Sequence, residues 1–410
     1  MRERIRQPEV DEARNLMRMM ISVSQRPGVG NQEFVKTVGS HLRDCGYYIK
    51  EYPDPELEDR AVLAIEIGDP YGEQILAALS HSDVVGIEHQ TWDHDPWTLH
   101  EEDNKWFGRG VCDTHGSGVA MLLAGGRKDL QEKLRSRGQR ITILFTYDEE
   151  AAEPELSYRG ARRLIGQLGS EKIVTCDNFV VGEPTELNGK IRAMKSHKGR
   201  WLAHFTVKVE HPGHVSDKVQ NALMVGCGVV SKLSQYADVM KLGSKSDEVA
   251  GSFDPPYSTL QISAGDVKSH DYSTTPDEVR FTLDMRTLPD IHSLRVTEVR
   301  DLIENFPLED GVKITLEVVS DETGSASSDD SLIAQAARIA TDDELLGFNG
   351  GDEGYVLRLD GGMEGVTIGP GRLAYAHKPN EQVDVVSIIR AADIYSELFQ
   401  YISDNTARSE

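Results

Sequence analysis

Short apolar runs of strand length end directly in histidine or carboxylate motifs at several places in this chain. The run Ile75–Ser80 leads into His81 and Asp83, and the run Arg140–Thr146 leads into three consecutive acids. Helical patterns lie between such runs, and strands that alternate with helices form sheets with much parallel pairing. In open sheets of this kind, ligands bind beyond the carboxyl ends of the strands. The sequence therefore predicts an α/β fold with a mixed, largely parallel central sheet flanked by helices.

Five short motifs follow one another along the chain, and each places a histidine or a carboxylate at a predicted strand end or turn. They are His81-Ser82-Asp83, Cys112-Asp113-Thr114-His115-Gly116, Asp148-Glu149-Glu150, Gly182-Glu183-Pro184-Thr185 and His377-Lys378-Pro379-Asn380-Glu381. Imidazole and carboxylate ligands suit zinc, cobalt and manganese, whereas a soft all-thiolate site is excluded. Taken together, the motifs supply what a two-metal hydrolase needs.

Each of the first two motifs also has a structural interpretation. His81 and Asp83 point to the same side of an extended backbone, so one can bind metal while the other orients a ligand. Alternatively, they are a loop histidine and a helix-capping aspartate. Asp113 lies between a tight turn and a predicted helix over Ser117–Leu130. There it can bridge two ions about 3.5–4 Å apart, or serve as an ordinary N-cap.

The acidic triplet Asp148-Glu149-Glu150 is the sharpest single signal. Three acids that directly follow a buried strand repel one another, and a metal ion relieves that repulsion. One glutamate can bind the ion while its neighbour accepts a proton from the attacking water. The alternative is an ordinary acidic loop. Glu183 and His377 are ambiguous when taken alone, because a lone histidine is more often structural than a ligand.

The composition excludes some classes of binding partner and indicates the cellular compartment. The 410 residues carry a net charge of −24, which disfavours nucleic acid and anionic membranes because phosphate binding needs a basic face. No apolar run approaches the roughly 18–20 residues of a membrane span. The polar segment Met1–Arg6 argues against a secretory signal, and four scattered cysteines fit a reducing compartment. We therefore expect a cytoplasmic protein.

The pattern of predicted elements changes near Lys198. From there to residue 320 the order is strand, helix, strand, strand, helix, strand, which is the ferredoxin-like βαββαβ unit. This unit separates Glu183 from His377, so it is a domain inserted into the first one. The expected boundaries are 1–197 and 321–410 for the first domain and 198–320 for the insert, with Asp321–Asp329 as an interdomain linker.

Nearly the whole chain resembles the dinuclear zinc family of aminoacylases, glutamate carboxypeptidases and N-acyl amino-acid deacylases. The five motifs carry this resemblance. Within the family the chain is most similar to the acetylornithine deacetylases. Four segments carry that narrower resemblance: Gly182-Glu183-Pro184-Thr185, Ser196-His197-Lys198-Gly199, Gly213-His214-Val215-Ser216 and Gly369-Pro370-Gly371 with its downstream histidine.

The resemblance implies a role for each residue of the five motifs. The ligands of two divalent ions, expected to be zinc with cobalt or manganese as alternatives, would be His81, Asp113, Glu150, Glu183 and His377. Asp113 would bridge both ions, Glu183 would complete the first site and Glu150 the second. Asp83 would orient His81, and Glu149 would be the general base.

The resemblance also implies roles in the inserted lid domain. His214 would come from the partner subunit of a homodimer and would hydrogen-bond the oxyanion, whereas the alternative is a loop histidine. Arg286 would contact the substrate carboxylate, or else pair with Asp284 on its own strand. Ser273 stands where the family has an asparagine that places the substrate carboxylate, so that contact is in doubt.

Two further segments depart from the family pattern or extend it. His115 replaces a usual lysine, either as a polar neighbour of the metals or as an inert residue. The segment Gly350–Tyr355 is a candidate substrate loop, whose acids suit a cationic side chain.

The expected function is hydrolysis of N-acyl amino acids, with N-acetylornithine as the first substrate. The alternatives are a succinyl-diaminopimelate desuccinylase, a dipeptidase or carboxypeptidase, and a non-catalytic binding protein.

Overall fold

The computed structural model describes residues 7–26, 28–151, 153, 156–169, 171–214, 219–243, 252–269 and 273–406. The polar segment Met1–Arg6, Val215-Ser216 and Asp271-Tyr272 lie outside these residues. The chain divides into two compact units. The first unit comprises residues 1–195, 327–346 and 352–410, and the second comprises residues 196–326 and 347–351.

The first unit is built on a mixed sheet with four parallel strands at its centre. The strand order is β1 (Tyr48–Pro53), β2 (Ala61–Gly68), β6 (Gln139–Thr146), β3 (Glu73–His81), β7 (Asn178–Val181), β17 (Glu364–Thr367) and β10 (Met194–His197). Strands β6, β3, β7 and β17 are parallel, whereas β1, β2 and β10 pair antiparallel at the sides. The predicted mixed, largely parallel sheet is confirmed.

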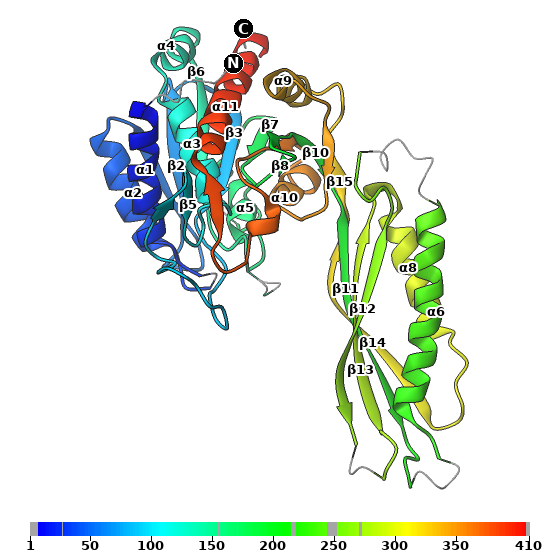
Figure 1. Ribbon diagram of the computed structural model, residues 1–410. Coiled ribbons are helices and arrows are strands. Elements are labelled where there is room, and N and C mark those ends of the chain that lie inside the picture. Colours follow the sequence, from blue (N-terminus) through cyan, green and yellow to red (C-terminus); the bar gives the residue numbers. More distant parts are fainter. Residues whose placement is uncertain are drawn as a thin grey trace. The chain divides into compact units, whose positions relative to one another are not determined.

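Helices cover both faces of this sheet, which is why its central strands are apolar along nearly their whole length (Figure 1). Ile143 and Phe145 of β6 contribute to one core, and Leu144 between them contributes to the other. The helices of the first core are α1 (Gln7–Ser22), α2 (Gln32–Asp44), α3 (His115–Gly125), α4 (Lys128–Arg137), α9 (Leu332–Thr341) and α11 (Val385–Asn405). The second core lies under α5 (Arg159–Leu164) and α10 (Gly354–Leu359).

The predicted single helix over Ser117–Leu130 was wrong. The structure has two helices, because α3 ends at Gly125 and α4 begins at Lys128. Two successive glycines have low helix propensity, which favours the break. Gly125 also packs closely on the sheet, since a Cβ there would lie 2.9 Å from Ile67.

In the part of the chain that the structure describes, the second unit is an antiparallel sheet packed against the α-helices α6 and α8. Its elements are β11 (Gly199–Val209), α6 (Ala222–Gly243), β12 (Thr259–Lys268), β13 (Glu278–Thr287), α8 (His292–Glu304) and β14 (Val312–Glu322). The strand order is β12-β13-β11-β14, and α6 and α8 lie on the same side of the sheet (Figure 1). The chain order is thus βαββαβ. Strand β11 alternates between buried and more exposed residues, as expected for a sheet covered on one face.

The predicted interdomain linker over Asp321–Asp329 contains the point where the chain passes from the second unit to the first, between residues 326 and 327. Its first residues complete β14, and Ser325–Ala326 form β15, which pairs with Ser196 and His197 at the end of β10. The hydroxyl of Ser325 lies 2.9 Å from Nε2 of His197, and both side chains are buried. The segment thus connects the two units, and its first part is held by paired backbone and by this hydrogen bond.

Short strands complete the described part of the chain. One small sheet has the order β18 (Gln382–Asp384), β5 (Lys105–Phe107) and β4 (His100–Glu102). The remaining strands are β8 (Glu186–Leu187), β9 (Lys190–Ile191) and β16 (Leu346–Phe348). Among the described residues, no helix combines the length and the apolar character that crossing a membrane requires.

Candidate metal centre

His81 is the last residue of β3 and is buried at the carboxyl edge of the parallel strands. Its Nδ1 lies 2.8 Å from the backbone carbonyl oxygen of Asp83. A carbonyl can only accept, so Nδ1 donates. Nε2 is directed at Oδ1 of Asp113, 3.0 Å away, and at Oε1 of Glu183, 3.6 Å away. One imidazole nitrogen and two carboxylate oxygens therefore converge within the spacing of a metal site.

A second group of ligand atoms lies on the other side of Asp113. Nε2 of His377 is 2.9 Å from Oε1 of Glu150 and 3.2 Å from Oδ2 of Asp113. Asp113 thus presents one carboxylate oxygen to each histidine. Such a carboxylate can bridge two divalent ions.

Glu381 holds the backbone that carries Asp113. Its buried carboxylate accepts hydrogen bonds from the backbone N–H groups of Gly110, Cys112 and Asp113, at 3.1, 2.9 and 3.0 Å. The guanidinium of Arg109 donates to the same carboxylate at 2.7 Å. Glu381 belongs to the last of the five motifs, yet the sequence suggested no role for it, because its partners lie far away along the chain.

Asp83 connects His81 to the acidic triplet. Its backbone carbonyl accepts from His81, while its carboxylate accepts the backbone N–H groups of Glu149 and Glu150, at 3.3 and 3.0 Å. The carboxylate itself is 3.9 Å from Nδ1 of His81. Asp83 therefore contacts the histidine through its main chain and positions the two glutamates through its side chain.

Asp148, the first acid of the triplet, faces away from the ligand groups. Its carboxylate accepts from Nε of buried Arg60 at 2.6 Å and from the backbone N–H of Gly28 at 3.0 Å. This ion pair anchors the loop, so the adjacent Glu149 and Glu150 remain available.

Glu149 lies beside both ligand groups, within 4.8 Å of ligand atoms of His81 and Glu150. Burial raises the pKa of its carboxyl well above the usual value; His81 opposes the shift, and the charge of Glu150 adds to it. Burial likewise raises the pKa of Glu183, with a contribution from Asp113. Burial also raises the pKa of Asp83 to about 6.

The residues present fit two divalent cations. Oε1 of Glu183 is buried without a hydrogen-bond partner in the described part of the chain. Burial alone would lower the pKa of His81, but Asp113 and the surrounding carboxylates raise it well above its usual value. The site thus draws in positive charge, which a metal ion supplies when the imidazole is neutral. The mixed nitrogen and oxygen donors suit zinc, cobalt or manganese.

His115 does not face the ligand groups. It is buried, its Nε2 lies 2.6 Å from the hydroxyl of Ser24, and its ring packs near Phe34. Burial lowers the pKa of His115 to about 3, with a contribution from the charge of His81. Of the two interpretations, the structure therefore favours the inert one.

The candidate substrate loop has its acids turned inward. Asp352 is fully buried, accepts from the backbone N–H of Gly354 at 2.9 Å and hydrogen-bonds Thr367. Glu353 is 1% exposed, and burial raises its pKa to about 7. Asp352 is committed to local structure, so the acids of this loop do not lie open to a cationic side chain.

The residues expected to contact substrate from the insert lie in the second unit. His214 forms an isolated bridge with Thr274, next to exposed Ser273. Arg286 lies on β13 and donates to Asp284 at 3.0 Å. That contact is the intrastrand pairing that the sequence left open as an alternative. The approach of these residues to the metal ligands stays a prediction.

Comparisons with known proteins agree with this fold. An acetylornithine deacetylase of Pasteurella multocida is 27% identical over 390 residues, which cover 92% of this chain and 93% of that protein. A di-peptidase of Saccharomyces cerevisiae has a similar structure, with a TM-score of 0.68 at 15% identity and 98% coverage of both chains. A dinuclear metal-binding peptidase of Bacillus subtilis gives a TM-score of 0.67 at 14% identity, covering 97% and 99%.

The class of the protein follows from these findings. The fold and the paired histidine–carboxylate groups are those of a metal-dependent hydrolase that acts on amide bonds. The chain belongs to peptidase family M20/M25/M40, whose sequence model matches residues 77–401. The family is one of dinuclear metal-binding peptidases.

Proposed function

We propose that the protein removes the acyl group from N-acyl amino acids and that N-acetylornithine is a substrate. The observation that supports hydrolysis is the placement of Asp113 between two histidines, with Glu149 beside both groups. The choice of N-acetylornithine is supported by the acetylornithine deacetylase from Pasteurella multocida, whose similarity extends over nearly the whole chain.

In this proposal His81, Asp113 and Glu183 would hold one divalent ion, and Asp113, Glu150 and His377 would hold the other. Zinc is the first metal to test, with cobalt and manganese as alternatives. Two bound ions would lower the pKa of a shared water and polarise the amide carbonyl. Asp83 and Glu381 are positioning residues, because they hold the backbone of the ligands rather than the ions.

Glu149 is the proposed general base. It accepts a proton from the attacking water, whose oxygen bonds to the amide carbonyl carbon. It then delivers that proton to the leaving amine, so that the C–N bond breaks and a carboxylate and a free amino group form. Burial raises the pKa of the Glu149 carboxyl, which is the direction that favours accepting a proton.

The second unit would supply the substrate contacts. We propose that His214 of one subunit donates a hydrogen bond to the oxyanion in the site of a partner subunit, which requires a homodimer. Arg286 would bind the substrate carboxylate after leaving Asp284, since a guanidinium suits that bidentate contact. Ser273 would be a weaker contact to the same carboxylate. The free cysteines among the described residues support a cytoplasmic location.

A substrate panel tests the proposal. Protein loaded with zinc or cobalt would be assayed on N-acetylornithine, N-succinyl-diaminopimelate and dipeptides, with metal content measured on the same sample. Rapid release of acetate from N-acetylornithine is expected. Dipeptide cleavage without turnover of the acetyl substrate would overturn the choice of substrate. It would favour the dipeptidase alternative, which the similarity to the di-peptidase from Saccharomyces cerevisiae supports.

A further inference from the structure

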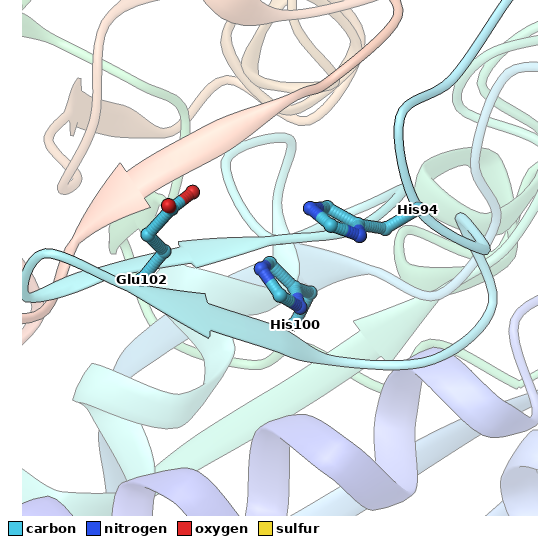
Figure 2. Close-up of side chains that lie close together, drawn as sticks. All are labelled: His94, His100 and Glu102. Carbon is cyan, nitrogen blue, oxygen red and sulfur yellow. The ribbon is translucent and has the colours of Figure 1, made fainter.

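A second cluster of potential ligands lies outside the candidate metal centre, at the start of the small sheet. His94 comes from the loop between β3 and β4, and His100 and Glu102 come from β4. Residues i and i+2 of a strand point to the same face. Figure 2 shows the three side chains gathered at one side of the strand, with the two imidazole rings face to face. Their centroids are 3.5 Å apart.

The polar contacts of these three side chains differ from those of their neighbours in the sequence. Glu101, between two members of the cluster, accepts from Arg14 and Arg18 on the other face of β4. Asp93 accepts from Asn380 at 2.8 Å. In the described ranges, by contrast, the side chains of His94, His100 and Glu102 make no hydrogen bond or ion pair.

The spacing is close to that of a metal site. One ligand atom from each of His94, His100 and Glu102 lies within 4.8 Å of the other two. In a tetrahedral zinc site the ligand atoms are about 3.3–3.6 Å apart, which follows from bonds of about 2.0–2.2 Å. His94 and Glu102 are exposed and His100 is half-buried. A small rotation of these side chains would therefore bring their ligand atoms to the spacing of a zinc site. The same rotation would separate the two stacked imidazole rings.

We propose that His94, His100 and Glu102 bind a third divalent cation of borderline softness, such as zinc. Two imidazoles and one carboxylate are a set that zinc accepts, with water completing the coordination. The ion would fasten the loop that carries His94 to strand β4. The proposal is separate from the catalytic function, because no ligand is shared between the two sites.

The loop that carries His94 is also hydrogen-bonded to the segment of His377 and Asn380. Gln90 donates from its side chain to the backbone carbonyl of His377 at 3.0 Å, and the backbone N–H of Asp93 donates to Asn380 at 2.9 Å. The loop thus supports the segment of His377 at one end and would be braced by the ion at the other.

The test is a count of zinc ions. Wild-type protein loaded with zinc would be equilibrated at about micromolar free zinc and its metal content measured by elemental analysis. We expect His94→Ala and His100→Ala each to hold one ion fewer per chain than the wild type, and Glu102→Gln to need more zinc for the same occupancy. His89→Asn is the matched control. It removes an imidazole from the same loop at a position with φ of 63°, which asparagine tolerates, and should keep the wild-type count.

The difference between proteins is the informative quantity, so the result does not depend on how many ions the catalytic centre holds. Equal zinc content in the wild type and the His94→Ala/His100→Ala double variant, with both folded by circular dichroism, would overturn the proposal. Loss of an ion in His89→Asn as well would also overturn it, because the binding would then be unspecific.

Discussion

Two consecutive acids after strand β6, Asp148 and Glu149, have different surroundings. Asp148 is paired with Arg60 and a backbone N–H, so its charge is satisfied locally. Glu149, one residue later, has no such pair among the contacts described, and burial raises its pKa. A half-buried acid that lacks a structural partner is suited to a proton-transfer role.

Glu149→Gln should lower turnover by about 10²–10⁴-fold, because the amide cannot accept a proton. Metal content should stay at the wild-type level, since Glu149 is not a proposed ligand. Turnover and bound metal would be measured on the same preparation. Activity close to wild type would mean that another group is the base, whereas metal loss would assign Glu149 to the ligands.

Glu381 acts on the metal centre through three backbone N–H groups. Glu381→Gln leaves some of these donors without a carboxylate and leaves buried Arg109 without its counter-charge. The affinity for metal should fall by about 10–100-fold, as for other residues that orient ligands. Competition with a chelator would measure it. Glu397→Gln, on the last helix, is the control and should bind metal as the wild type does.

At the scale of elements, the sequence predicts what is local and misses what is not. His81 and Glu183 stand directly after apolar runs, so a strand-end pattern identifies both. Arg109 and Glu381 are 272 positions apart in the sequence, so no periodic pattern of residues predicts their pairing. The break between α3 and α4 was missed because apolar spacing continues across Gly125 and Gly126. The two glycines favour the break, but the close packing of Gly125 against the sheet, which also contributes, is not visible in the spacing.

Asp54 lies in the connection from β1 to β2, and its hydrogen-bonded carboxylate links this connection to α5. Asp54 accepts from Arg159 at 2.7 and 2.9 Å, from Tyr147 at 2.7 Å and from two backbone N–H groups. Burial opposes ionisation, but these hydrogen bonds, with that of Arg159 the largest, lower the pKa of Asp54 to about 2.

This element should make the protein sensitive to acid. The folded-state pKa of Asp54 lies below the unfolded value of about 3.9, so its contribution is complete above that pH and disappears as pH falls toward about 2. Asp54→Asn should lose roughly 3 kcal/mol at neutral pH and show a flatter decline below pH 4. Urea unfolding at pH 7 and pH 3 would measure both. Exposed Asp103→Asn is the control, and identical pH profiles for wild type and Asp54→Asn would contradict the assignment.

At the scale of the whole molecule, the proposed ligands and base all belong to the first unit, whereas His214 belongs to the second. If the partner subunit supplies His214, variants of the two units can test this without knowledge of how the units are placed. Glu149→Gln and His214→Ala would each be nearly inactive alone, because every site would lack one group.

Mixing these two variants should restore activity. Half of the dimers in an equal mixture are mixed, and one of their two sites combines Glu149 of one chain with His214 of the other, so about a quarter of wild-type turnover is expected. The measurement is turnover after subunit exchange, with each variant alone as the control. Absence of recovery in mixtures shown to contain mixed dimers would place His214 in the same subunit as its site.

The hydrogen bonds between Glu381 and the backbone at Asp113 also make the candidate metal centre depend on a segment that is synthesised long after Asp113. The first β strands and α3 emerge from the ribosome long before residues 377–381, so the nascent chain holds Asp113 without its support. A chain shortened before His377 by premature termination or proteolysis would retain most of its core yet lack both a proposed ligand and the carboxylate that holds the backbone of Asp113. Synthesis of residues 377–381 is thus a condition for assembling the candidate metal centre.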